Sequence, residues 1–535
     1  MTTEAIRRPL FPACTAVWRF LCRPVRWLWR RKWKIALWLA TLITLAWQYE
    51  NWHGRRDYEG QIALFKAEYG DMKWHDFTPP RVADEENFFA APVFETFVVK
   101  EPRRPPARGA GQSEEVYNYQ RKCDELADAL PHGRFLRMKT PEIKTVPCGW
   151  VGELPPEEGI AFLDLKTWVQ EEAKAGKQKP GGMTDIQWLQ ASLPEDETVQ
   201  GFIAALTRKK ASLLPHAADR WAVGEKLNNP MAIPLNSWSG VFEPARRIAL
   251  RARAAARAGD GLAARQHCEV LWLLAEGFGN AHTMVGSLVA LALTGVVNTA
   301  TTEALACRCW TEADFVILRD RMQRIDEERW VFTALNLEGF GRHLWPGDNK
   351  DWIRRGSRKF TSSWKPDHMM VWIMARGPDG WIDANLAWQL RWWQKLMVPD
   401  SRGDDLLALK RNLEANLQPV MQESVRGLFG EVPSPRKVLA ALVLPEMSNI
   451  PSNALQQQTR RRELLLAIAT ERHLLAKGTL PKTVEDLVPA FIESIPGDPY
   501  QPGAPLRWEA GTDGIRYRIL SANNDARPGF PEQVP

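Results

Sequence analysis

One charge-free stretch near the N-terminus constrains this chain more than any other feature. Residues 35–49 read IALWLATLITLAWQY and contain no Asp, Glu, Lys or Arg. With the flanking Trp33 and Trp52, the apolar segment reaches about 20 residues, the length that a helix needs to cross the hydrocarbon core of a bilayer. The sequence therefore predicts a transmembrane helix over residues 35–52.

The flanks of this segment predict its orientation. Residues 1–34 contain nine Arg or Lys and a single acidic residue, Glu4. A basic flank of this kind stays cytoplasmic, and tryptophans are typical of the two membrane interfaces. We therefore expect a single-pass protein of the inner (cell) membrane, with a cytoplasmic tail over residues 1–34 and a periplasmic body. The expected anchor residues are Trp33, Ile35, Leu37, Leu39, Leu42, Ile43, Leu45 and Trp47.

A cleaved signal peptide is the alternative interpretation. It fits less well, because the basic region before the apolar run is long and no small-x-small cleavage site follows. Residues 11–29, which mix aromatic side chains with arginines, suit either an interfacial helix on anionic lipid or a solvated tail.

The net charge of +6 belongs to the tail, because the rest of the chain holds 61 basic and 63 acidic residues. The body therefore lacks the positive field that collects phosphates, and we expect no nucleic-acid partner. We expect lipid contacts through the N-terminal helix and protein partners of unknown identity. At 535 residues, the chain is long enough for several folding units.

The region that follows the anchor divides into two parts. Residues 53–112 are expected to form an exposed helical stalk near residues 58–69 and then an extended, Pro-rich segment, because prolines at 79, 80 and 92 prevent a continuous helix. Residues 113–458 are expected to form a helical body.

Four consecutive helices are expected within residues 242–326 of that body, at 244–258, 262–278, 283–306 and 311–325. Gly-containing breaks separate them, and Thr311 with Asp314 forms a capping-box pattern. Short connections make such helices antiparallel neighbours, so we expect an αα-hairpin bundle or solenoid. The third helix, around residues 283–302, carries no charge; it suits a buried core helix or a second membrane span.

Residues 330–398 are rich in tryptophan, which suits a surface that stacks on sugar rings, a membrane-facing surface or an ordinary core. Leu386, Leu390 and Trp393 follow the spacing of a packed helix. Trp388 and Trp392 lie on a neighbouring face, so we expect them to be candidates for contact with a partner.

The cysteines form no clear pattern. Cys123 and Cys148 are a plausible disulfide in an oxidising compartment. Cys307 and Cys309 suit a redox or metal pair, but no second pair of ligands stands at zinc spacing, which favours buried or unpaired thiols.

The chain is expected to close with a small α+β module over residues 459–535. An amphipathic helix at 459–477 ends at Gly478, and Thr483 with Asp486 caps a short second helix. Residues 496–499 form a turn, and residues 506–509 and 515–520 alternate like the strands of a β-hairpin.

This order resembles the globular domain of type II secretion major pseudopilins. The shared motifs are G-x-x-P from Gly478, L-V-P at 487–489, a D-P turn at Asp498, P-L-x-W at 505–508 and Y-x-x-x-S from Tyr517. The N-terminus has no prepilin-peptidase site, and the arginines at 460–462 make the helix too polar for a filament stem. These departures argue against a pilus subunit and for a reused docking module.

The remainder resembles a group of uncharacterised bacterial single-pass membrane proteins. The motifs that carry the resemblance are P-P-x-V-x-D-x-x-N at 79–87, R-A…A-G-D at 253–260 and G-W-x-x-x-N at 380–385. The pseudopilin resemblance further implies a Ca²⁺ site near the closing strand, with oxygen ligands from Asp498, Asn523, Asn524 and Asp525, although polar loop residues are the simpler interpretation.

The sequence contains no G-x-S-x-G, H-E-x-x-H, Walker A or G-x-G-x-x-G motif, so we assign no catalytic residue and no cofactor beyond that Ca²⁺. Three functions remain. The favoured one is an anchored envelope protein with a non-enzymatic protein-interaction or scaffold role. The others are an envelope glycan or peptide hydrolase with a Trp-lined site, and an accessory of a type II secretion or pseudopilus-like system.

Overall fold

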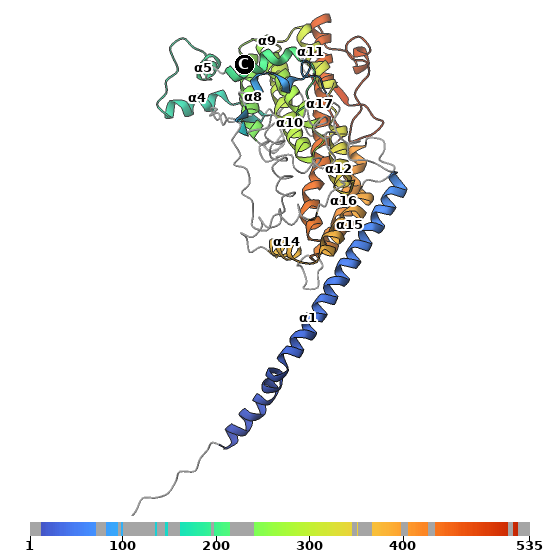
Figure 1. Cartoon of the computed structure of the whole chain (residues 1–535). Helices are drawn as coiled ribbons and strands as arrows, with labels where there is room; N and C mark the ends of the chain where they lie inside the picture. The colour runs from blue at the N-terminus through green and yellow to red at the C-terminus, as the bar shows by residue number, and fades with distance from the viewer. Residues whose placement is uncertain are drawn as a thin grey trace, which may run out of the picture. The chain divides into compact units, whose positions relative to one another are not determined.

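The computed structural model describes residues 12–70, 82–94, 98–99, 134–135, 145–147, 161–193, 197–213, 240–344, 350, 366–396, 405–425, 434–511 and 517–522. In this part the protein is mainly helical, and an antiparallel two-stranded sheet lies near its C-terminus (Figure 1). The expected mainly α class with a C-terminal hairpin is confirmed.

The chain divides into two compact units. Unit 1 comprises Met1–Ala67, Lys350–Arg391 and Ser424–Ala441; unit 2 comprises Glu68–Asn349, Trp392–Glu423 and Leu442–Pro535.

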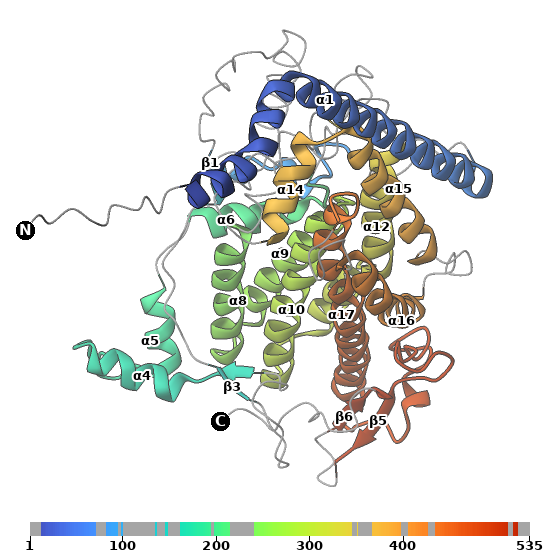
Figure 2. The same cartoon turned by 90° about the horizontal axis from the view of Figure 1, so that it is seen from below.

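The core of unit 2 is a set of helices joined by short connections. They are α8 (Phe242–Arg257), α9 (Gly261–Gly279), α10 (Met284–Cys307) and α11 (Glu312–Gln323). Helices α8, α9 and α10 lie side by side (Figure 2), so the four predicted helices of this region are confirmed. The expected capping box of α11 is present, with the Asp314 carboxylate accepting a hydrogen bond from the Thr311 backbone N–H at 3.0 Å.

Buried ion pairs connect these helices. Glu303 of α10 is fully buried, and its carboxylate accepts hydrogen bonds from both Arg253 and Arg257 of α8. Glu269 of α9 accepts bonds of 3.0 and 2.8 Å from Arg321 of α11. A buried carboxylate is costly unless it is paired in this way, so each pair fixes how its two helices align.

Helix α10 is, among the described residues, the only helix with both the length and the hydropathy of a membrane span. Within that apolar stretch, 67% of the residues are buried. The helix packs against α8, α9 and α12 (Glu327–Leu344), and the Asn298 amide donates to Gln457 Oε1 at 3.2 Å. This packing favours the core-helix interpretation of the sequence over a second span.

The Pro-rich segment runs along unit 2 where it is described. The Asn87 side chain is fully buried; it donates to Ser212 O and accepts from the backbone N–H of Ser212, both at 3.0 Å. Phe88, Phe89 and Phe94 then enter the hydrophobic core. The Asn of the P-P-x-V-x-D-x-x-N motif thus fastens this segment to residues 208–213. Residues 82–94 form turns and a 3₁₀ helix where an extended chain was expected.

The C-terminal module is built on a longer helix than the sequence predicts. Helix α17 spans Val438–Lys477 and begins at residue 438 instead of the expected 459, continuing through two prolines that normally signal a break. It ends at Gly478, whose φ of +73° suits glycine. The 3₁₀ helix η8 (Val484–Leu487) and the antiparallel strands β5 (Arg507–Ala510) and β6 (Tyr517–Leu520) follow as expected.

This module shares the core of the hairpins, because residues 464–469, Leu506, Tyr517 and Ile519 belong to the same cluster of buried apolar side chains as α9 and α10. The remaining elements described in this unit do not line the cavity of the candidate site. They are η2 (Phe88–Ala90), β1 (Val98–Val99), β2 (Arg134–Phe135), β3 (Thr145–Pro147), β4 (Ala161–Leu163), α4 (Leu165–Lys174), α5 (Asp185–Ser192), α6 (Glu197–Ala204) and η3 (Ala205–Thr207).

Unit 1 is organised around a close helix contact. Helix α1 (Pro12–Tyr69) meets the first turn of α15 (Asp379–Leu396), and α14 (Pro366–Arg376) precedes that turn. A Cβ atom added at Gly54 would lie 1.9 Å from Gly380 O, and one added at Gly380 would lie 1.9 Å from Glu50 O. Only a residue without a side chain allows two backbones to approach this closely.

Polar bonds surround this contact. The Trp381 indole donates to Glu50 Oε2 at 2.9 Å, and the Asn51 side chain accepts the Gly380 backbone N–H at 3.0 Å. The Asn385 amide bonds Pro435 O at 2.7 Å. The G-W-x-x-x-N motif is therefore a docking element for residues 50–54 of α1. The stretch expected to form an exposed stalk, near residues 58–69, is exposed or half-buried apart from the buried Phe65.

We predict opposite effects of the same substitution at two glycines of α1. Gly60 has open space around its Cα, so Gly60→Ala should stabilise the helix by up to about 1 kcal/mol through helix propensity. Gly54→Ala should instead lower the free energy of unfolding by about 1–3 kcal/mol through overpacking against Gly380. Hydrogen exchange over residues 379–385 measures the contact; equal protection in both variants would contradict it.

Candidate functional site

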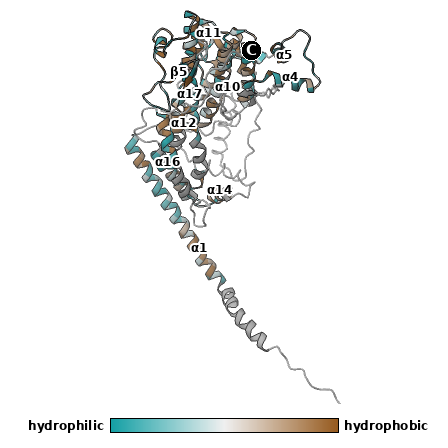
Figure 3. Ribbon diagram, turned by 180° about the vertical axis from the view of Figure 1, so that it is seen from behind, coloured by the Kyte–Doolittle hydropathy of each residue, from teal (hydrophilic) through white to brown (hydrophobic). Residues whose placement is uncertain are grey.

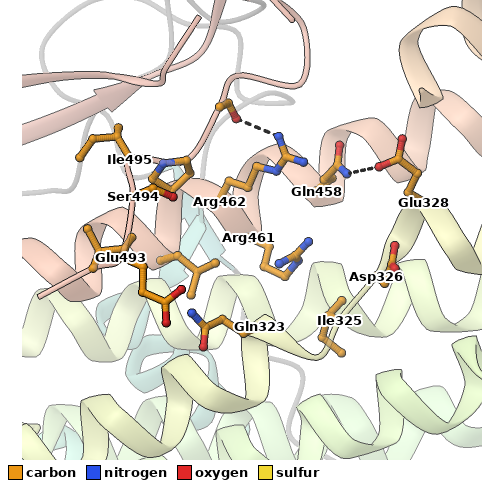
Figure 4. A pocket seen from close by; sticks show the side chains of 14 residues that line it. Gln323, Ile325, Asp326, Glu328, Gln458, Arg461, Arg462, Glu493, Ser494 and Ile495 are labelled. Carbon is orange, nitrogen blue, oxygen red and sulfur yellow. Dashed lines mark hydrogen bonds between the residues drawn. The ribbon is translucent and has the colours of Figure 1, made fainter. Parts of the chain in front are cut away.

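A polar cavity of about 450 Å³ lies within unit 2 (Figure 4). Its walls come from the junction of α11 and α12, from the middle of α17 and from the loop that precedes β5. This volume is within the usual range of ligand sites. The lining residues are Gln323, Ile325, Asp326, Glu328, Gln458, Arg461, Arg462, Leu465, Ile492, Glu493, Ser494, Ile495, Pro496 and Gly497.

Two consecutive arginines of α17 reach this cavity with different surroundings. The Arg461 guanidinium is buried and forms hydrogen bonds of 2.8–3.0 Å to both oxygens of the fully buried Glu327. It also donates to Met322 O at 3.1 Å. Because its donors are engaged by α11 and α12, Arg461 holds the wall of the cavity in place.

Arg462 is half-buried, and its guanidinium donates to Gly497 O at 2.9 Å (Figure 4). No carboxylate of the described residues lies within ion-pairing distance of it. Burial lowers the pKa of Arg462, and the like charge of Arg461 lowers it further, while Glu328, Glu327 and Asp498 oppose the shift. The cation is therefore partly desolvated and only partly neutralised.

Two of the acidic side chains at the cavity already have protein partners. Glu328 accepts hydrogen bonds at 3.2 Å from the Leu406 backbone N–H, at the start of α16 (Leu406–Val425), and from the Gln458 amide. Asp326 Oδ1 accepts the Arg329 backbone N–H at 2.9 Å. Glu493 stands at the exposed rim. Arg462 is therefore a cation at the cavity whose guanidinium makes a single hydrogen bond within the described residues.

Of the four expected Ca²⁺ ligands, the structure describes Asp498 alone. Asn523, Asn524 and Asp525 lie outside the described residues. Asp498 is buried, and its carboxylate accepts hydrogen bonds of 2.9 Å from the Tyr500 backbone N–H and the Ser521 hydroxyl, as well as one from the Ala522 backbone N–H. Asp498 thus ties the D-P turn to the closing strand. No group of three or more His, Cys, Asp or Glu suited to a metal occurs within the described ranges.

The predicted outward position of Trp388 and Trp392 is wrong, and their burial agrees with the core interpretation of the tryptophan-rich region. Trp388 and Trp392 are only 4% and 5% exposed. Helix α15 is buried on every side from Ile382 to Leu390, so the helical stripe did not distinguish a packed face from a free one. The Lys437 and Lys395 ammonium groups lie 5.7 and 4.9 Å from the centres of the Trp388 and Trp392 rings, respectively. Neither ring has the open face that a partner contact needs.

Cys307 and Cys309 are free and half-buried, and burial raises their pKa to about 12 and about 11, respectively. Thiols with raised pKa are poor nucleophiles and poor metal ligands. This agrees with the interpretation as unpaired thiols. Cys123 and Cys148, the expected disulfide pair, lie outside the described residues.

The predicted anchor residues of α1 are largely exposed. Apart from the half-buried Ile35, they expose between 41% and 80% of their surface. Figure 3 shows the apolar turns of α1 giving way to hydrophilic ones toward its C-terminal end. The exposed anchor side chains are Trp33, Leu37, Leu39, Leu42, Ile43, Leu45 and Trp47.

The cavity was not predicted from the sequence. Its one local signal was the Arg run at 460–462, which indicated only that α17 was too polar for a filament stem. A run of like charges usually marks a solvated surface, and the pairing of Arg461 with Glu327 spans more than a hundred residues. Nothing in a short window of sequence predicts such a pair.

Glu276 of α9 is buried near Arg321 and Arg324, away from the cavity lining. Burial raises its pKa from 4.5 to about 7, against the opposing effect of the two arginines and of a hydrogen bond from Ala211. A raised carboxyl pKa adds stability that is fully present below the unfolded value and is lost as the pH rises through the folded value.

We therefore predict that the free energy of unfolding falls by roughly 3 kcal/mol between pH 4.5 and pH 7 because of Glu276. Glu276→Gln should remove this fall and stabilise the protein at neutral pH. Denaturant unfolding of the detergent-solubilised chain at several pH values measures it, with Glu485→Gln, at an exposed position, as the control. A profile of Glu276→Gln that still matches the wild type would contradict the prediction.

Comparison with known proteins identifies no function for this cavity. No family model, no curated protein and no solved structure matched the chain. The resemblance of the C-terminal module to pseudopilins therefore stays a prediction, and the function has to be argued from the residues themselves.

Proposed function

We propose that this chain is a single-pass protein of the inner membrane whose periplasmic body binds another protein without catalysing a reaction. The observation that carries the proposal is the band of exposed apolar side chains on α1. Proteins that act free in water rarely expose a contiguous apolar surface of this size, and such a surface marks a membrane or protein contact. The basic residues before the band favour a cytoplasmic N-terminus.

The distribution of residues along α1 supports a membrane as the occupant of this band. Trp33 and Trp47 stand near its two ends, where indoles prefer the bilayer interface. The polar contacts of the same helix begin directly after it, with Arg436 donating to Glu50 Oε2 at 2.9 Å and Arg391 pairing with Asp57 at 2.9 Å. The apolar half and the protein-bound half are thus separate.

The non-enzymatic part of the proposal rests on what the polar groups of the body do. The residues of the three recognisable motifs bind other parts of the fold: Asn87 fastens a segment, Arg253 pairs with Glu303, and Trp381 holds α1. The hydrolase alternative needs an open Trp-lined floor, whereas Trp388 and Trp392 are buried, which supports the non-enzymatic proposal. A body of fixed helices with a polar cavity suits protein binding better.

We predict that a charge in the apolar half of α1 will release the protein from membranes. Leu39→Arg and Ile43→Arg place a guanidinium near the centre of the span, which costs about 2.5–3.5 kcal/mol per residue. Leu64→Arg is the matched control, because Leu64 is 59% exposed on the same helix but lies beyond the polar contacts. The measurement is the fraction retained after carbonate extraction; equal retention of all three variants would contradict the anchor.

We further predict that a full-length protein carrying a photo-crosslinker on the hairpin surface will capture a discrete partner in intact cells. Leu262 and Leu288 are suitable positions, because both are exposed on α9 and α10. Mass spectrometry of the adducts identifies the partner. Adducts that contain only lipid or random proteins would argue against a binding role.

A further inference from the structure

Arg462 presents a cation to the cavity with most of its capacity unused. A guanidinium has five N–H donors in a planar fork. Within the described residues, its guanidinium makes one hydrogen bond, to Gly497 O. Two carboxylates that line the same cavity accept hydrogen bonds from other groups: Glu328 from the Gln458 amide and Asp326 from the Arg329 backbone N–H. A half-buried cation of this kind is stabilised by an anionic acceptor, and a carboxylate matches the fork with two parallel bonds.

The surroundings of Arg462 decide between kinds of anion. Asp326, Glu328 and Glu493 also line the cavity, so a doubly charged phosphate would meet strong like-charge repulsion. A singly charged carboxylate would meet less. Apolar side chains line the same cavity and favour a ligand that carries hydrocarbon next to its charge. These are Ile325, Leu465, Ile492, Ile495 and Pro496.

We propose that this cavity binds a carboxylate presented by an apolar peptide segment of a partner protein, with Arg462 as the residue that recognises it. The inference rests on the proposed protein-binding function and names the chemistry of the partner. The carboxylate comes either from a Glu or Asp side chain or from a chain terminus. Arg461 does not take part directly, because its guanidinium already donates to Glu327 through Nε and Nη2 and to Met322 O through Nη1.

The test uses the full-length protein in detergent and measures dissociation constants by isothermal titration calorimetry. The probes are a leucine-rich tetrapeptide with one internal glutamate and blocked ends, the same peptide with glutamine, a version with a free C-terminal carboxylate, and inorganic phosphate. We expect the carboxylate peptides to bind, the glutamine peptide to bind at least about ten-fold more weakly, and phosphate not to compete. The two carboxylate arms distinguish a side chain from a chain end.

Substitutions then assign the binding to Arg462. Arg462→Gln should weaken the carboxylate peptides about ten-fold or more, and Arg462→Lys should recover part of the loss, because it keeps the charge without the fork. Arg329→Gln removes an exposed charge next to the cavity and should leave binding unchanged. Thermal unfolding of each variant confirms that the fold is retained.

Three results would overturn the inference: equal binding of the glutamate and glutamine peptides, unchanged affinity in Arg462→Gln, or tighter binding of phosphate than of carboxylate. The crosslinking experiment separates this outcome from the broader proposal. If Arg462→Gln still captures the same partner in cells, the partner binds elsewhere, and the protein-binding function stands without this site.

Discussion

Buried pairs between arginine and carboxylate are the interaction on which the rest of unit 2 depends. Glu327 is fully buried at the start of α12, and Arg461 of α17 approaches it with two donor nitrogens. Removal of either partner leaves an uncompensated charge in the interior, which typically costs 3–5 kcal/mol. Since Glu303 and Glu269 form equivalent pairs between other helices, the pairs select one alignment of the bundle. Because α11, α12 and α17 form walls of the cavity, that alignment also sets the positions of these walls.

Local sequence signals predicted the hairpin helices closely because their determinants lie within a few residues of each other. Thr311 and Asp314 cap α11 as expected, and Gly478 ends α17 with positive φ. The two closing strands were found from their alternation. In each case the energy that sets the boundary comes from a hydrogen bond or a backbone preference within one turn, so a short window contains the information needed to predict it.

Features that depend on distant residues were not predicted. The periodicity of α15 placed Trp388 outside the packed stripe, although the helix is buried all round. The start of α17 was missed because proline normally interrupts a helix. The cavity depends on α11, α17 and the loop before β5, which meet only in the fold. Helical periodicity identifies which residues share a face, but it does not say how many faces the fold will cover.

The continuity of α1 has a mechanical consequence. Trp47 and Gly54 belong to one uninterrupted helix, so about 10 Å of rigid backbone separates the apolar band from the glycine contact. No flexible linker therefore separates the apolar band of α1 from its contact with α15 in unit 1. If the band lies in a bilayer, as proposed, a change in hydrocarbon thickness that tilts this helix would turn unit 1 through the same angle.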